Sequence, residues 1–361
     1  MTRVDALLVA GGTGGHVYPA IAVANVLSRD DAWNIRFAVD ARPASADAVA
    51  RAGFELDILP LRRGLQRRLA WSNVRSAIDG ARATLSAWRL VRRLQPRVVV
   101  GFGAYVTVPV LVAARLHSVP LVVHEQNGRP GLANRLAVRL GARAATSIPG
   151  TPLPGAIVTG NPVRPEIANV IRAPATPPLV GVVGASLGAG ALNDAAFELY
   201  DLWRDRDDVA VHHVTGERHF GECAKRLEAR RTPGDRLRYT LVAYEHDMPG
   251  LYRRATVMVT RAGGSVAELA AAAVPAIIVP WSGAAEDHQT ANARRFALDG
   301  AAVNLPEGEC RGARLAAEIE GLLSDPARLE SMAGAMRRLA RPDAAERVAA
   351  LIRDAARDGG T

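Results

Sequence analysis

The chain has 361 residues, 49% of them hydrophobic, and carries a formal net charge of +9 at pH 7. That length exceeds one typical core and suits two domains, and the apolar content excludes a wholly disordered chain. The positive charge favours anionic partners such as nucleotides, lipid diphosphates or an acidic membrane surface.

The two cysteines, Cys223 and Cys310, have neither the spacing of a zinc site nor that of a disulfide framework. We therefore expect a reduced, cytosolic protein with no metal. The N-terminal apolar run, residues 4–9, ends in glycines and is too short for the core of a secretory signal. No stretch approaches the ~20 apolar residues of a membrane-spanning helix, so we expect any membrane contact to be peripheral.

Strands, loops and helices alternate in the first half of the chain. The run 4–9 leads into a glycine loop and a helix-like stretch from about residue 19 to residue 27. The runs 97–100 and 121–123 also read as strands, each followed by a loop, and an apolar helix follows the first. This alternation predicts βαβ units and a mostly parallel sheet.

The second half begins as the first does. Proline-rich stretches at 149–154 and 171–179 mark a domain boundary, and an apolar strand at 179–183 then leads into a glycine loop and a helix near Ala191. Further strands are predicted at 209–214, 238–242, 257–259 and 276–279, and a helix at 342–357. We predict two Rossmann-like, doubly wound parallel-sheet domains, residues 1–160, joined by the helix 342–357, and residues 161–341.

Three glycine loops are candidate phosphate sites, because glycines let backbone N–H groups approach an anion and a following helix adds its positive N-terminal end. They are Gly11–His16, Gly184–Ala189 and Arg261–Glu268. Ser186 adds a hydroxyl donor to the second loop, and Glu268 in the third is a candidate acceptor for ribose hydroxyls. The alternatives are a ligand-free tight turn for the first loop and an ordinary first-turn carboxylate for Glu268.

These motifs occur in the order seen in the MurG family, which the whole chain resembles. The matching segments are GGTGGHVYPA, GFGAYVTVP, HEQNGRPGLANR, TGNPVR, GASLGA, RAGGSVAEL and PWSGAAEDHQTANAR. The family transfers N-acetylglucosamine from UDP-N-acetylglucosamine to lipid I, the undecaprenyl-diphosphate-linked muramyl-pentapeptide. The resemblance implies a GT-B fold with two domains facing a cleft, and an inverting transfer to the 4-hydroxyl with no metal or other cofactor.

The resemblance also implies roles for individual residues. Those of the acceptor site are Gly12, Thr13, Gly14, Gly15, His16, Tyr105 and Asn134. Those of the donor site are Thr13, Gly14, Gly15, Asn127, Arg164, Ser186, Gly263, Gly264, Ser265, Glu268, His288 and Gln289. Two departures from the family pattern bear on the donor site: Leu187 stands where the family has glutamine, and the loop Arg261–Glu268 is one residue shorter.

The reaction needs a base for the acceptor hydroxyl and positive charge at the leaving diphosphate. His16 is the leading candidate base, because the ordinary imidazole pKa of ~6.5 leaves it mostly neutral in the cytosol. Glu125 is the alternative. Loop N–H groups and Ser186 are expected to meet the charge of the leaving group.

The segment 61–96 interleaves arginines with Leu65, Leu69, Trp71, Leu85 and Trp88. A basic, tryptophan-bearing amphipathic segment suits an anionic membrane, so we expect peripheral attachment at the cytoplasmic face of the plasma membrane. The alternative is an ordinary Rossmann helix with a solvated basic face. Cell-wall synthesis and division proteins are further expected partners.

Three other functions remain open from the sequence. The first is another GT-B glycosyltransferase that acts on a glycolipid or natural product. The second is a nicotinamide-dependent oxidoreductase, although the spacing G-x-G-x-x-G is absent and Asp40 is only a loose match to its acidic residue. The third is a nucleic-acid binder, which the low aromatic content of 5% disfavours.

Overall fold

The computed structural model describes residues 3–12, 14–29, 33–60, 72–184 and 188–358, and its contacts divide the chain into two units. Unit 1 contains residues 1–164 and 341–361, and unit 2 contains residues 165–340. The boundaries predicted from the sequence lie after residues 160 and 341. Within the described residues, no helix combines the length and apolar character needed to cross a membrane.

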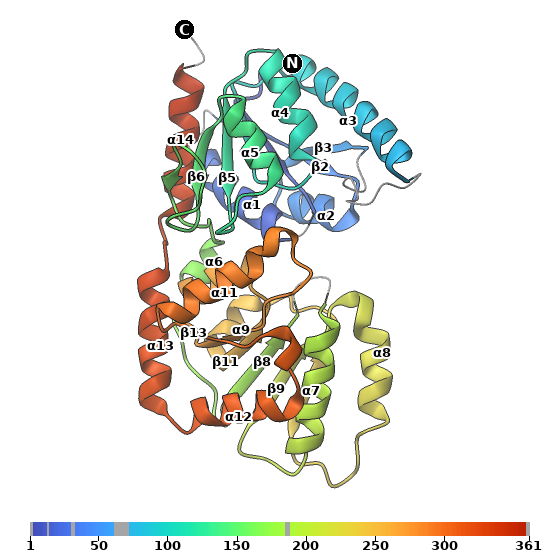
Figure 1. Ribbon diagram of the computed structural model, residues 1–361, viewed down its shortest axis with the longest axis vertical. Helices are drawn as coiled ribbons and strands as arrows, with labels where there is room; N and C mark the ends of the chain where they lie inside the picture. Colours follow the sequence, from blue (N-terminus) through green and yellow to red (C-terminus); the bar gives the residue numbers. More distant parts are fainter. Residues whose placement is uncertain (1–2, 13, 30–32, 61–71, 185–187, 359–361) are drawn as a thin grey trace. The chain divides into compact units, whose positions relative to one another are not determined.

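Unit 1 is built on a seven-stranded, fully parallel sheet of order β3-β2-β1-β4-β5-β6-β7 (Figure 1). Its strands are β1 (Ala6–Ala10), β2 (Ile35–Asp40), β3 (Glu55–Leu59), β4 (Val98–Gly101), β5 (Leu121–Glu125), β6 (Arg143–Thr146) and β7 (Ile157–Val158). Its helices are α1 (Gly14–Ser28), α2 (Pro43–Arg51), α3 (Ser72–Leu94), α4 (Thr107–Leu116), α5 (Leu132–Arg139) and α14 (Ala344–Asp358).

Unit 2 repeats the plan with a six-stranded parallel sheet of order β10-β9-β8-β11-β12-β13. Its strands are β8 (Leu179–Val183), β9 (Ala210–Val214), β10 (Arg238–Val242), β11 (Ala255–Thr260), β12 (Ala276–Ile278) and β13 (Ala302–Asn304). Its helices are α6 (Pro165–Ala168), α7 (Gly190–Trp203), α8 (Glu217–Glu228), α9 (Met248–Arg254), α10 (Ser265–Ala271), α11 (His288–Leu298), α12 (Gly312–Leu323) and α13 (Pro326–Leu339), with 3₁₀ turns at η1 (Ala285–Asp287) and η2 (Glu307–Glu309).

The two doubly wound parallel sheets confirm the predicted fold class. In each sheet the strand order reverses beside the first strand of the unit, at β1/β4 in unit 1 and at β8/β11 in unit 2. Loops that leave the carboxyl ends of two such strands diverge and leave a crevice, which is where ligands bind in open α/β sheets. Each unit therefore has one predetermined place for a site.

The predicted start of the first helix was wrong. The helix expected from about residue 19 begins at Gly14, and Pro19 lies inside it. The prediction began the helix at Pro19 because proline is favoured at the first position of a helix. In the structure the missing N–H of Pro19 leaves the carbonyl of Gly15 without its helical partner.

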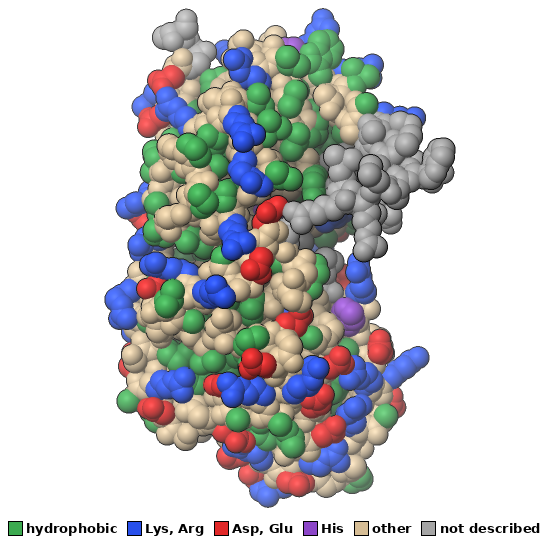
Figure 2. Space-filling model, viewed as in Figure 1, with side chains coloured by type: hydrophobic (Ala, Val, Ile, Leu, Met, Phe, Trp, Pro, Cys, Tyr) green, Lys and Arg blue, Asp and Glu red, His purple; other side chains and the backbone are tan. Residues whose placement is uncertain are grey.

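The surfaces of the two units differ in composition. On the face drawn in Figure 2, hydrophobic side chains gather over unit 1 with arginines between them, whereas side chains of both charges are mixed over unit 2. Mixed charge is ordinary for a protein surface that meets only water, whereas gathered apolar side chains indicate a contact surface.

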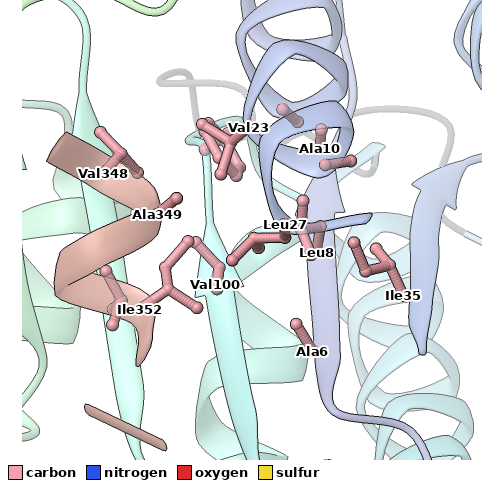
Figure 3. Packing of buried hydrophobic residues seen from close by; sticks show 14 of the residues in the cluster. Ala6, Leu8, Ala10, Val23, Leu27, Ile35, Val100, Val348, Ala349 and Ile352 are labelled. Atoms are coloured by element: carbon pink, nitrogen blue, oxygen red, sulfur yellow. The ribbon is translucent and has the colours of Figure 1, made fainter. Parts of the chain in front are cut away.

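The core of unit 1 is completed by the last helix of the chain. Every residue of β1 is buried, as in a strand covered by helices on both faces. Figure 3 shows one of these faces, where α14 packs beside α1 and the sheet. Its labelled members are Ala6, Leu8, Ala10, Val23, Leu27, Ile35, Val100, Val348, Ala349 and Ile352. The opposite face is covered by α3, α4 and α5.

Truncation of one α14 side chain measures this contribution. We expect Ile352→Ala to lower the free energy of unfolding of unit 1 by about 2–4 kcal/mol, because Ile352 is fully buried and the substitution leaves a cavity. Urea unfolding checks it, with the exposed Arg347→Ala on the same helix as the control, expected within about 0.5 kcal/mol of the parent. Equal midpoints for the two variants would contradict the packing.

Candidate active site

The first glycine loop lies at the switch point of unit 1, where His16 lies close to both diverging loops. Gly14, Gly15 and His16 form the first turn of α1. A Cβ atom built on Gly103, in the loop after β4, would lie 3.3 Å from the Nδ1 and Cε1 atoms of His16, and one built on Gly12 would lie 3.7 Å from its Cδ2 atom. Gly103 also has a φ of +89°, so both its backbone conformation and the close approach of His16 favour glycine at this position. Thr13 lies outside the described residues.

Glu125 organises the loop that follows β5. It is 3% exposed, and both of its oxygens accept hydrogen bonds. Oε1 accepts from the backbone N–H of Asn127 at 3.0 Å and from its Nδ2 at 3.1 Å, while Oε2 accepts from Gly131 N at 2.9 Å and from Asn134 Nδ2 at 2.8 Å. A carboxylate with both oxygens bonded in this way holds the loop in shape.

The other predicted residues of unit 1 lie at the surface or at its end. Tyr105, in the loop after β4, is 54% exposed. The guanidinium of Arg164 stacks over the ring of Tyr18 on α1, 4.4 Å from its centroid. Arg164 is thereby held to the helix that carries His16.

His124, which was not among the predicted site residues, is buried next to Glu125 in the chain. Its Nε2 donates to Gly160 O at 2.9 Å, and its Nδ1 has no hydrogen-bond partner among the described residues. Burial lowers the pKa of His124 to about 4, since a proton on Nδ1 would be neither solvated nor bonded. The hydrogen bond to the Gly160 carbonyl raises the pKa of His124 but does not offset the effect of burial.

In unit 2, the second glycine loop follows β8 and the third follows β11, so both leave the sheet at that unit's switch point. Residues 185–187, including Ser186, lie outside the described part. Gly188 has a φ of +77°, and a Cβ there would lie 2.2 Å from the carbonyl oxygen of Thr215. The loop thus lies against the end of β9 with no room for a side chain.

A buried polar network fixes the position of that contact. His213 Nε2 donates to Asn193 Oδ1 at 2.9 Å, and the hydroxyl of Tyr239 donates to His213 Nδ1 at 2.7 Å. Asn193 Nδ2 in turn donates to Thr215 O at 3.2 Å. Burial lowers the pKa of His213 to about 3, so the ring stays neutral and keeps this pairing.

The third loop is anchored by Arg261, which is 6% exposed. Its guanidinium donates to Val279 O at 3.2 Å and to Glu307 Oε1 at 2.5 Å, and Glu307 Oε2 accepts from Ser282 N at 3.0 Å. Burial raises the pKa of Glu307, but hydrogen bonds from Ser282 and Arg261 outweigh it and leave that pKa lowered. Arg261 therefore joins the third glycine loop to the segment after β12.

The remaining predicted donor residues lie around the same loop. Gly263 and Gly264 precede α10, which begins at Ser265. Glu268 on α10 accepts from the Tyr252 hydroxyl at 3.0 Å, and Gln289 Oε1 on α11 accepts from Trp281 N at 2.9 Å. His288 is the first residue of α11.

Asn292, which sequence analysis missed, ties α11 to the third glycine loop. It is 1% exposed, and its Nδ2 donates to Ala262 O at 3.0 Å. One signal was present in the sequence, because Asn292 follows His288 by four residues and so lies on the same face of a helix.

Comparison with known proteins assigns the chain to a class. The glycosyltransferase family 28 N-terminal domain matches residues 6–146, and the family 28 C-terminal domain matches residues 179–348. The first match lies in unit 1, and the second covers most of unit 2 and ends within α14; together they define the chain as a family 28 glycosyltransferase.

Individual relatives narrow the class. A Pseudomonas entomophila protein named UDP-N-acetylglucosamine–N-acetylmuramyl-(pentapeptide) pyrophosphoryl-undecaprenol N-acetylglucosamine transferase is 38% identical over 95% of this chain and 96% of its own. A protein of the same name from Alkalilimnicola ehrlichii is 40% identical over 97% and 99%. The crystal structure of Acinetobacter baumannii MurG superposes with a TM-score of 0.75 at 26% identity, covering 98% and 100%. The chain belongs to the MurG family.

The fold alone would not have decided the activity. A UDP-GlcNAc 2-epimerase from Neisseria meningitidis shares it with a TM-score of 0.71 at only 12% identity. One architecture hosts several chemistries, so the shared fold does not by itself identify the reaction.

His124 makes the free energy of unfolding depend on pH. Its pKa is lower in the folded protein than the ~6.5 of an unfolded histidine, so the unfolded chain takes up a proton that the folded chain refuses. We expect the free energy of unfolding to fall as the pH drops from about 6.5 to 4, by up to ~1.4 kcal/mol per pH unit from this group.

Urea unfolding between pH 7.5 and 4.5 measures this dependence. His124→Gln keeps an N–H donor for Gly160 but cannot titrate, so its stability should vary less with pH than that of the parent. His213 titrates similarly in both proteins and serves as the shared background. Identical pH dependence in the two proteins would contradict the assignment.

Proposed function

We propose that the chain transfers N-acetylglucosamine from UDP-N-acetylglucosamine to the 4-hydroxyl of lipid I, with inversion at the anomeric carbon, to make lipid II for peptidoglycan synthesis. The observation that carries the proposal is the near-full-length similarity to relatives that bear this activity in their names, at 38% and 40% identity. The glycine loops at both switch points support it, because a reaction between two diphosphate-linked sugars needs two anion sites.

In this proposal unit 1 binds the acceptor. The first-turn N–H groups of α1 have no helical carbonyl to bond and point at the acceptor's diphosphate. His16 lies in that turn and takes the proton of the 4-hydroxyl as its oxygen bonds to the anomeric carbon. Tyr105 and the loop held by Glu125 complete the acceptor side, with Asn134 acting through Glu125.

Unit 2 binds the donor. The second and third glycine loops, with Ser186, receive the leaving UDP, and the bond between the anomeric carbon and the diphosphate oxygen breaks with its electron pair on UDP. Glu268, His288 and Gln289 lie on the helices beside the third loop and bind the ribose and sugar hydroxyls. Asn127 and Arg164 are the proposed donor-binding residues of unit 1.

A transfer assay tests the proposal. Labelled UDP-N-acetylglucosamine and a short-chain lipid I analogue should give labelled lipid II analogue at the same rate with and without a chelator. Failure of the protein to bind UDP or UDP-N-acetylglucosamine by calorimetry, together with no transfer, would overturn it. Transfer to a natural-product acceptor but not to the lipid I analogue would favour the alternative glycosyltransferase.

The role of His16 is tested by substitution. We expect His16→Ala to lower kcat by at least ~10²-fold with the KM for UDP-N-acetylglucosamine within about twofold, since proton removal is lost and donor binding is not. His246→Ala, an exposed histidine of unit 2, is the control and should keep its kcat. Retention of most of the turnover by His16→Ala would exclude His16 as the base.

We also infer that unit 1 attaches to the anionic, cytoplasmic face of the plasma membrane, where a lipid-linked acceptor resides. The predicted amphipathic helix is α3, although residues 61–71 of that segment lie outside the described part. Trp88 does not project from it: the side chain is half-buried against His117 and Arg92. Leu85 is 48% exposed among the exposed Arg82 and Arg89.

Neighbouring helices extend this surface. Leu116 of α4 is 69% exposed, and Leu132 and Leu136 of α5 are 65% and 38% exposed. Neither α4 nor α5 contains an acidic residue, whereas arginines of α5 lie exposed beside its leucines. Exposed leucines among arginines suit the boundary between acyl chains and anionic headgroups (Figure 2). Proteins of cell-wall synthesis and cell division are the partners we expect there.

Vesicle flotation tests the attachment. The parent protein should float with anionic vesicles at low salt, and the double variant Leu132→Ser/Leu136→Ser should lose several-fold in the bound fraction because the apolar contact is removed. Leu298→Ser, which changes an 85% exposed leucine of unit 2, is the matched control and should bind as the parent does. A parent protein that stays with the soluble fraction would overturn the inference.

A further inference from the structure

Two residues at the end of β2, Asp40 and Arg42, hold Gly12 of the first glycine loop between them. Asp40 Oδ2 accepts from Gly12 N at 2.8 Å, and Arg42 Nη1 donates to Gly12 O at 2.7 Å. The two side chains also pair with each other, with Arg42 Nε 3.3 Å from Asp40 Oδ2. No step of the proposed reaction uses either residue.

These contacts prevent the Gly12 N–H from binding an anion. Both of its backbone polar groups are bonded to the β2 end, so its N–H is directed at a carboxylate. The anion-binding amides must then come from the α1 side of the loop, from the helix's first turn. Gly12 supports the acceptor site through its fixed position.

Arg42 also reduces the repulsion expected between the Asp40 carboxylate and a bound diphosphate. The Asp40 carboxylate is 4% exposed and lies beside a loop proposed to bind a diphosphate. Two neighbouring anions repel each other, and water screens a buried charge poorly. The Arg42 guanidinium, with a side chain 43% exposed, touches that same carboxylate oxygen and offsets its charge.

We propose that Asp40 and Arg42 are positioning residues of the acceptor's diphosphate site: Asp40 fixes Gly12, and Arg42 fixes the Gly12 carbonyl while it cancels the Asp40 charge. The inference rests on the proposed function, because it names what the first glycine loop binds. Arg42 acts through Asp40 and Gly12 rather than by touching the phosphate. Lysine can replace it only in part, since one ammonium group carries the charge but does not reproduce the two-point contact.

Steady-state kinetics with a short-chain lipid I analogue test this arrangement. We expect Arg42→Ala to raise the KM for the acceptor about tenfold, with kcat and the KM for UDP-N-acetylglucosamine within about twofold. Asp40→Asn should change the acceptor KM less than threefold, because its amide oxygen still accepts from Gly12 N and the charge is gone. The double variant Asp40→Asn/Arg42→Ala should recover most of the loss, since no uncompensated carboxylate remains.

Arg36→Ala is the matched control. Arg36 lies at the start of the same strand and pairs with Asp57, with 2.6 Å between Nε and Oδ2, so its loss breaks an ion pair on β2 away from the loop. Its acceptor KM should equal that of the parent. Arg42→Lys should recover only part of the loss, which separates geometry from net charge.

Two results would overturn the inference. One is an acceptor KM for Arg42→Ala equal to that of Arg36→Ala. The other is an equal loss in Arg42→Ala and in the double variant, because Arg42 would then act on the diphosphate directly. Hydrogen exchange gives a readout without catalysis: the Gly12 amide should exchange faster in Asp40→Ala than in the parent. An inactive parent protein would instead refute the proposed function, and the exchange result would still stand.

Discussion

Parallel pairing of β1 with β4, and of β8 with β11, is the constraint on which both sites depend. Parallel strands end at the same edge of a sheet, and the reversal of strand order at these two pairs sends the following loops apart. The tight loops then need residues without side chains, which is why Gly103 lies against His16 and Gly188 against Thr215. The loops can bind an anion at these points because neither the sheet nor a helix uses all of their backbone N–H groups.

Around these loops, buried charged and amide side chains hold the backbone in place. Glu125 holds the loop after β5, Arg261 with Glu307 joins the third glycine loop to the segment after β12, and Asn292 adds a bond from α11. A buried polar group must be bonded or it destabilises the fold, so each of these side chains has a specified partner. These bonds fix the loops in which the predicted site residues of each unit lie.

Much of the architecture follows from the sequence, and the rest depends on distant contacts. The strands at 179–183 and 238–242 were predicted to the residue, because short apolar runs bounded by loops are local signals. The helix start at Gly14 was missed, since a proline inside a helix is tolerated only by context. The pairing of His213 with Asn193 and Tyr239 joins positions 20 and 26 residues away, and no local pattern specifies it. Asp40 was considered only as a nucleotide residue, and its bond to Gly12 crosses 28 positions.

The placement of α14 in the core of unit 1 has a consequence for synthesis on the ribosome. All of unit 2, residues 165–340, has been translated before α14 exists, whereas the sheet of unit 1 lacks the cover of Val348, Ala349 and Ile352 until the end. The nascent chain thus carries an apolar sheet face that α1 covers only in part throughout the translation of unit 2, and chaperones bind such exposed apolar surface. Native packing of the first domain is in this sense a post-translational event.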